Sequence, residues 1–171
     1  MDKKVLVAYA TKYGATAEIA AKIGEVLSQA GVSAHVMPVD QVTDPGSYGA
    51  VILGSAVYIG RWRREAARFL KANEKQLSAC PVWFFSSGPT GKGDPVELAN
   101  GWRFPKSLQS IADRIGPREI ALFHGVIDVD KVKSFDKWMI QKVGASTDDS
   151  RDWETIASWA ESVAAELKKN S

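Results

Sequence analysis

Short runs of apolar residues without polar alternation constrain the fold of this chain more than any other feature. The clearest run, residues 5–10, ends at the polar segment that begins with Thr11. Such a run is typical of a strand in a parallel sheet, where both faces of the sheet are covered. We expect five strands of this kind, at residues 5–10, 34–37, 51–53, 82–85 and 120–123.

Amphipathic segments separate these runs. Ile19, Ile23 and Leu27 share one helical face, and Gly31 is expected to end that helix. A second helix is expected to begin in the arginine-rich segment after Gly60 and to carry residues 66–77, and others are expected at about 106–115 and at 153–167. Because strands alternating with helices form a parallel sheet covered on both faces, we expect an α/β fold. The simplest organisation is a single domain of residues 1–171 with an insertion at about 126–150 before the last helix.

Composition excludes several classes of function. The formal net charge of +2 is too small to indicate nucleic-acid binding by itself. Cys80 is the single cysteine, so an internal disulfide or a cysteine metal cluster is excluded, and the two histidines lack metal-ligand spacing. The first apolar run is too short for a signal peptide, and the longest, residues 50–60, is too short to span a membrane. These features predict a soluble, cytoplasmic protein without a metal site.

The first predicted strand is followed by a loop that suits a phosphate group. Ligands of open α/β sheets bind at the carboxyl ends of strands, and here Thr11 and Thr16 flank Gly14 at the start of a helix. Backbone N–H groups and the helix N-terminus would attract the anion, and the two hydroxyls would donate to it. The alternative is that one threonine only caps the helix. The loop lacks both a P-loop and a GxGxxG pattern, which leaves a mononucleotide such as FMN.

Two more loops follow neighbouring predicted strands, at residues 54–60 and 86–91, and are rich in glycine or small polar residues. Small residues allow the backbone to approach a flat ring closely. The predicted cofactor site therefore consists of three segments: Thr11, Lys12, Tyr13, Gly14, Ala15 and Thr16; Ser55, Ala56, Val57, Tyr58, Ile59 and Gly60; and Ser86, Ser87, Gly88 and Pro89.

The pattern Thr11-x-x-Gly14-x-Thr16 after a buried strand resembles the phosphate loop of flavodoxins. The segments 54–56 and 86–88 fall where flavodoxins place the two loops that hold the isoalloxazine ring of FMN. This resemblance covers nearly the whole chain. It implies a doubly wound, five-stranded parallel sheet of order 2-1-3-4-5 with helices on both faces.

Within that superfamily, three segments resemble the quinone-dependent protoporphyrinogen IX dehydrogenase family: residues 54–57 with Gly60, residues 135–140 and residues 147–154. The resemblance implies an FMN-dependent oxidoreductase that removes hydrogen from a porphyrinogen-like substrate and passes electrons to a quinone. In this chain Ile59 directly precedes Gly60, where an aromatic residue is expected, and Tyr58 stands one position earlier. The cofactor would carry the chemistry, so no catalytic side chain is predicted.

An arginine cluster follows the second loop. Arg61, Arg64 and Arg68 lie near one face of the predicted helix, with Arg63 beside them. Cations at a helix N-terminus oppose the helix dipole, so Arg61 and Arg64 are candidates to bind carboxylates of a substrate or of a partner protein. Porphyrin propionates would fit. The alternative is a solvated helix face.

Three further features are candidates for a functional role. Residues 131–143 combine lysines with an apolar stripe, which is typical either of a helix at the inner membrane surface or of one packed on the sheet. Trp62 and Trp102 are candidate walls for the flavin or its substrate, and His124 ends the fifth strand, where a proton-transfer role is conceivable.

Two alternatives to the enzyme hypothesis use the same fold: a flavodoxin-type electron-transfer protein and a non-catalytic module without flavin. The family resemblance implies that electron-carrying flavodoxins are typically acidic, so a net charge of +2 weakens the electron-transfer alternative without removing it.

Overall fold

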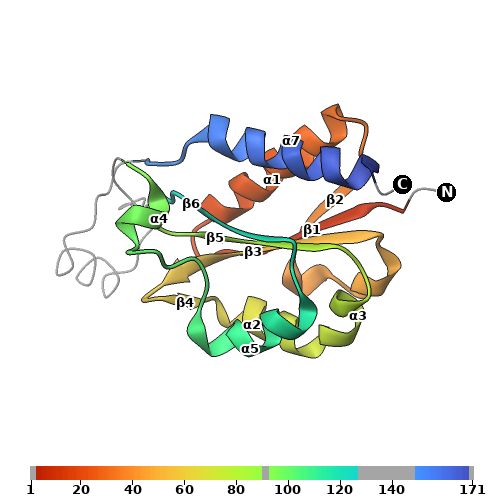
Figure 1. Ribbon diagram of the computed structural model, residues 1–171, viewed down its shortest axis with the longest axis horizontal. Coiled ribbons are helices and arrows are strands. Elements are labelled where there is room, and N and C mark those ends of the chain that lie inside the picture. Colours follow the sequence, from red (N-terminus) through yellow and green to blue (C-terminus); the bar gives the residue numbers. More distant parts are fainter. Residues whose placement is uncertain (1–2, 90–92, 127–148, 170–171) are drawn as a thin grey trace.

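A parallel sheet between two helical layers organises the chain (Figure 1). The structure is a computed structural model that describes residues 3–89, 93–126 and 149–169. The parallel strands are β1 (Val5–Ala10), β2 (Ala34–Pro38), β3 (Ala50–Tyr58), β5 (Val82–Ser87) and β6 (Glu119–Phe123). Their spatial order is β2-β1-β3-β5-β6, which confirms the predicted order 2-1-3-4-5. A short strand, β4 (Arg61–Trp62), pairs antiparallel with the end of β3 and was not predicted.

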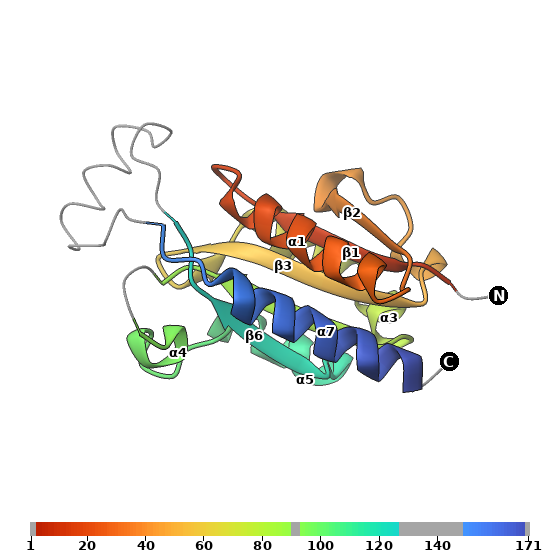
Figure 2. The ribbon, with the colours of Figure 1, turned by 90° about the horizontal axis from the view of Figure 1, so that it is seen from above.

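Helices cover both faces of the sheet, as expected. The helices α1 (Ala15–Gln29) and α7 (Trp153–Lys169) lie next to each other on one face (Figure 2). The opposite face carries α2 (Arg64–Ala72), α3 (Glu74–Ser78) and α5 (Gln109–Ile115). Shorter helical elements complete the described chain: η1 (Val39–Gln41), η2 (Pro45–Ser47), α4 (Pro95–Leu98) and η3 (Lys106–Leu108).

Alternate residues of β1 belong to two different cores, which explains why the run is apolar throughout. Leu6 and Ala8 face the core that contains α2 and α5. Val5 and Val7 face the core beneath α1 and α7. All four side chains are buried, and burial of a valine or leucine side chain contributes about 1.5–3 kcal/mol. A polar residue at any of these positions would therefore cost stability on one face or the other.

The third strand is longer than predicted. Gly54 was expected to end it, but β3 continues to Tyr58. Gly54 is a strand residue whose missing side chain makes room for an aromatic ring, since a Cβ atom there would lie 2.0 Å from the Phe85 ring. In the same way Ser86 and Ser87, predicted as loop, belong to β5. Small polar residues at these positions therefore mark the ends of strands rather than the beginnings of loops.

Two helices also differ from prediction. The single helix expected at residues 66–77 is divided at Asn73, whose side-chain amide donates to the Phe69 carbonyl at 2.9 Å. The helix expected from Lys106 begins as the 3-10 turn η3 and becomes α-helical at Gln109.

Most of the predicted insertion lies outside the described residues. The apolar stripe formed by Phe135, Trp138, Met139 and Val143, and its expected membrane contact, fall in that part of the chain. Among the described helices, none combines the length and the apolar character that a membrane crossing requires.

Candidate functional site

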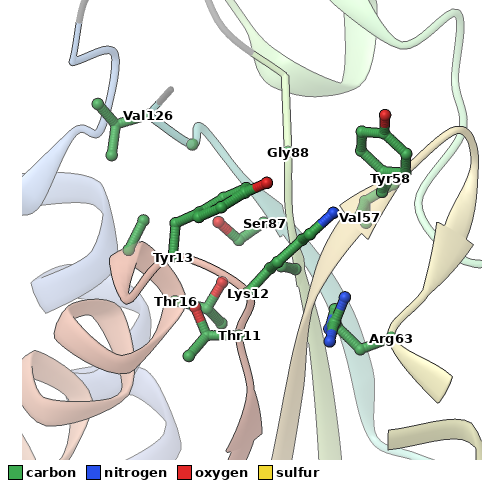
Figure 3. Close-up of a pocket in the computed structure, with 13 residues that line it drawn as sticks. Thr11, Lys12, Tyr13, Thr16, Val57, Tyr58, Arg63, Ser87, Gly88 and Val126 are labelled. Atoms are coloured by element: carbon green, nitrogen blue, oxygen red, sulfur yellow. The ribbon is translucent and has the colours of Figure 1, made fainter. Parts of the chain in front are cut away.

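A pocket opens where β1, β3 and β5 end, and residues from all three predicted segments line it (Figure 3). The lining residues are Thr11, Lys12, Tyr13, Ala15, Thr16, Ala56, Val57, Tyr58, Arg63, Ser87, Gly88, Gly125 and Val126. The remaining predicted residues, Gly14, Ser55, Ile59, Gly60, Ser86 and Pro89, do not line it. The sheet therefore brings together the three segments, but not every residue of each.

The first segment leaves the N-terminus of α1 open toward the pocket. Gly14 is the N-cap residue, with a left-handed φ of 93°, and it makes no side-chain capping bond. Its N–H group donates to Thr11 Oγ1 at 3.0 Å. Because Gly14 is the N-cap residue, neither threonine occupies that position. Thr16 lies in the first turn and is only 1% exposed. The first N–H groups of a helix lack intrahelical partners and carry positive potential, so this arrangement suits an anion.

Two tyrosines and a lysine form the upper part of the pocket. Lys12 Nζ lies 5.3 Å from the centroid of the Tyr13 ring and 5.2 Å from that of the Tyr58 ring, and it stands between the two rings in Figure 3. Tyr13 follows β1, whereas Tyr58 is the last residue of β3. Aromatic rings from two different strand ends thus face a common space, as a planar ligand requires.

A two-residue turn explains why Ile59 points away from this space. Tyr58 pairs with Arg61, and between them Ile59 and Gly60 both have positive φ, 51° and 68°. This is the geometry of a type I′ hairpin turn. Positive φ is unusual and strained for a β-branched residue. The turn leaves the Ile59 side chain 68% exposed and directs the aromatic residue at 58 into the pocket.

Ser55 and Ser86, the two predicted serines outside the pocket, take part in internal hydrogen bonds. Ser55 Oγ accepts from the Arg63 N–H at 2.9 Å and donates to the Ala56 carbonyl. Ser86 Oγ accepts from Trp62 Nε1 and donates to the Arg103 carbonyl, both at 2.8 Å. These bonds fix the start of α2 and the position of Trp62 relative to the sheet.

Neither candidate tryptophan lines the pocket. Trp62 is 5% exposed and packs edge-on against the rings of Phe84 and Phe104. Trp102 lines a separate cavity together with Phe104 and Glu119. Side chains alternate between the two sides of an extended chain, so Trp62 faces the core whereas its neighbours Arg61 and Arg63 point the other way.

One arginine that the sequence analysis did not select contributes to the pocket. Arg63 lines it and pairs with Glu65 at 3.2 Å, whereas Arg61 and Arg64 are exposed and do not line it. The charged side chains among the described lining residues, Lys12 and Arg63, are both cationic. An anionic or electron-rich ligand would therefore be favoured there.

Gly125 and Val126, just after β6, complete the wall and were also not predicted. The Gly88 N–H donates to the Phe123 carbonyl, and the Gly125 N–H donates to the Pro89 carbonyl at 2.9 Å. A Cβ atom on Gly125 would lie 3.2 Å from the Gly88 carbonyl oxygen, so glycine allows these two segments to touch. The signal that could have found Gly125 is its position directly after a buried strand.

His124, considered for proton transfer, supports the pocket from behind. Its ring nitrogens lie within hydrogen-bond distance of the Pro89 and Gly93 carbonyls, and it does not line the pocket. Within the described residues no three His, Cys, Asp or Glu side chains form a group that could hold a metal ion.

Comparison with known proteins shows a similarity to flavodoxins over most of the chain. The sequence profile described as "Flavodoxin domain" matches residues 6–154. Protoporphyrinogen IX dehydrogenase [quinone] from Escherichia coli strain K12 is 25% identical over 176 residues, covering 94% of this chain and 94% of that protein.

Two solved structures show the same fold. The WrbA-like flavodoxin protein from Agrobacterium tumefaciens has a TM-score of 0.60 at 16% identity, covering 99% of this chain and 100% of that one. The rubredoxin oxygen:oxidoreductase from Desulfovibrio gigas has a TM-score of 0.62 at 16% identity, covering 97% of this chain. This chain spans only 36% of that longer protein.

Proposed function

The chain belongs to the flavodoxin domain family, and on that basis we propose that it is an FMN-dependent oxidoreductase of the protoporphyrinogen dehydrogenase type. The observation that carries the proposal is the pocket itself. An uncapped helix N-terminus with the buried Thr16 lies beside the two tyrosines, at the ends of three neighbouring strands.

The residues present fit the parts of FMN. The N–H groups at Ala15 and Thr16, with the hydroxyls of Thr11 and Thr16, would hold the phosphate. Tyr13, Tyr58 and the backbone of Ala56 and Gly88 would hold the ring system. When bound, FMN supplies hydride and single-electron transfer.

The chain's own residues then have binding and electrostatic roles. Lys12 and Arg63 provide positive potential that favours added negative charge in the pocket. Val57 and Val126 contribute apolar surface to the pocket from two different segments. No side chain needs to act as a nucleophile.

The substrate class is proposed from the E. coli relative and from the arginines. That relative is named as acting on protoporphyrinogen IX with a quinone. We propose a porphyrinogen-like substrate whose carboxylates meet Arg63 in the pocket and the exposed Arg61 and Arg64 near its rim. A quinone would accept the electrons that the substrate loses.

A flavodoxin-type electron-transfer protein is the second candidate. The observation that favours it is the exposed tip of the β3–β4 hairpin, where Ile59 lies next to Tyr58 at the pocket. A redox partner protein could contact that tip while electrons pass to or from a flavin beneath it.

One set of measurements separates these candidates. The purified protein should be yellow, or bind FMN more tightly than riboflavin, and should oxidise protoporphyrinogen anaerobically when a quinone is added. FMN binding without turnover by any quinone would leave the electron-transfer protein. Absence of both flavin binding and turnover would refute both candidates.

A further inference from the structure

The segment Asp149–Trp153, part of a motif that the proposed function does not use, lies against the first turn of α1. Arg151 is its central residue, and the side chain is only 9% exposed. The guanidinium donates to both carboxylate oxygens of Asp149, at 3.0 and 2.8 Å. It also stacks on the Trp153 ring, 4.7 Å from the ring centroid. Arg151 is thus held in one orientation by its own segment.

The remaining contacts of Arg151 are with α1. Its guanidinium donates to the carboxylate of Glu18 and, at 3.3 Å, to the Ala15 carbonyl. Ala15 and Thr16 line the pocket, and Glu18 is the acidic residue of the same turn. Arg151 does not line the pocket itself, but it contacts the backbone that does.

The same segment also contacts a second part of the pocket wall. The Ser150 N–H donates to the Gly125 carbonyl at 3.3 Å, and Gly125 lines the pocket beside Gly88. A short piece of chain therefore connects the phosphate side of the pocket with the wall that follows β6.

Electrostatics gives Arg151 a second role besides holding the backbone. A carboxylate in the first turn favours the helix, but it repels an anion bound at the same helix end. Arg151 pairs with two carboxylates, those of Glu18 and Asp149, so its positive charge offsets part of the negative charge beside this helix end. The hydrogen bonds that the guanidinium donates to Asp149 raise the pKa of Arg151.

We propose that Arg151 is a positioning residue for the phosphate of the flavin, because it holds the first turn of α1 and offsets part of the charge of Glu18. This inference rests on the proposed function and adds a residue to it. It also assigns a role to the motif at residues 147–154: Arg151 holds the phosphate end of the pocket, and Asp152 accepts two hydrogen bonds from Thr155 at the start of α7.

The test is titration of the protein with FMN and with riboflavin, which lacks the phosphate. R151Q should raise the dissociation constant for FMN about tenfold, and that for riboflavin less than about twofold, at low ionic strength. The matched control is R118Q, because Arg118 likewise pairs with a carboxylate on a helix, Glu166 of α7, and lies over a tryptophan ring, that of Trp83. Arg118 does not line the pocket and should leave both constants unchanged.

Two further variants separate positioning from folding. Adding E18Q to R151Q should restore much of the FMN affinity, because it removes the carboxylate that Arg151 offsets. R151K keeps the charge and should retain most of the preference for FMN over riboflavin. The phosphorus NMR signal of bound FMN should shift in R151Q and remain unchanged in R118Q.

Several results would overturn the inference. Equal weakening of FMN and riboflavin in R151Q would make Arg151 a structural clip only. If R151Q does not fold, the variant E18Q is the test, and it should tighten FMN binding. An unchanged ratio of the dissociation constants for FMN and riboflavin in E18Q would refute the proposed role of Arg151. Wild-type protein that binds neither flavin would refute the proposed function itself, whereas a wild-type preference for FMN that R151Q retains would refute this inference alone.

Discussion

Ser86 provides the sharpest test of how the structure divides roles at the end of β5. The sequence pattern places Ser86 and Ser87 in one flavin loop, yet only Ser87 lines the pocket. Ser86 is fully buried and bridges Trp62 Nε1 and the Arg103 carbonyl. We therefore expect Ser86→Ala to lower stability and Ser87→Ala to lower flavin affinity.

The magnitude follows from the two groups that Ser86→Ala would leave without a partner. The Trp62 N–H is buried and would lose its acceptor, which costs about 1–3 kcal/mol. The Arg103 carbonyl is only part-buried, so water can replace its lost donor and its cost is about 1 kcal/mol or less. A total of about 1–4 kcal/mol lowers the Tm of a chain of this size by roughly 2–16 °C.

Urea unfolding of the flavin-free protein measures the stability change directly, and FMN titration measures the second effect. Trp62→Phe provides a double-mutant cycle, since it removes the N–H that Ser86→Ala leaves unsatisfied. With the N–H absent, the further cost of Ser86→Ala should fall to about 1 kcal/mol or less. A change in unfolding free energy below about 0.5 kcal/mol for Ser86→Ala in the wild-type background would refute the bridging role.

Four further predictions rest on other parts of the structure. Thr16→Ala should weaken FMN binding by about 1–3 kcal/mol and leave riboflavin binding unchanged, and equal losses in the two titrations would contradict the phosphate assignment. Tyr58→Ala should change the fluorescence or potential of bound flavin, whereas Ile59→Ala should not; identical spectra for both variants would remove Tyr58 from the site. Arg63→Ala should raise KM for a carboxylate-bearing substrate more than Arg61→Ala or Arg64→Ala, because ion pairs made by the exposed Arg61 and Arg64 are worth about 1 kcal/mol or less each. Steady-state kinetics at low salt would measure the difference. The hydrogen bonds from Thr155 hold the pKa of Asp152 below its ordinary value of 3.8, so the stability that Asp152 contributes is present above that pH and is lost as pH falls through the lowered pKa. Asp152→Ala should therefore cost about 1 kcal/mol of unfolding free energy near neutral pH and little in strong acid. Urea unfolding at both pH values would test this.

The strands of the sheet could be predicted because a strand that is buried on both faces has apolar residues at every position. A strand such as β1 contributes to two cores, so polar residues are excluded along its whole length. The ends of strands show no such pattern. Gly54 looks like a terminator in the sequence, although the structure uses it to accommodate the Phe85 ring. The break at Asn73 was missed because the apolar pattern continues across it, although an asparagine is less favourable inside a helix than at its end.

The three segments of the site could also be predicted, because the carboxyl ends of parallel strands meet at one edge. Which side chains face the ligand could not, because that depends on register. Ser55 is paired with Ser86, and Ala56 with Ser87. Paired residues of parallel strands project to the same face of the sheet. Ser55 and Ser86 therefore share the face that holds Trp62, whereas Ala56 and Ser87 line the pocket.

The arginine cluster shows why charge alone does not identify a binding residue. A helical interpretation of the sequence groups Arg61 with Arg64 and leaves Arg63 aside. The structure instead turns the chain at Ile59 and Gly60 and continues it as β4, so that Arg61 and Trp62 lie on a short strand. Alternation along this extended chain buries Trp62 and brings Arg63 into the pocket wall. A two-residue turn with positive φ therefore decides the position of Arg63 at the site. This turn could not be predicted from preferred turn residues, because its first position is an isoleucine where Asn, Asp or Gly is usual.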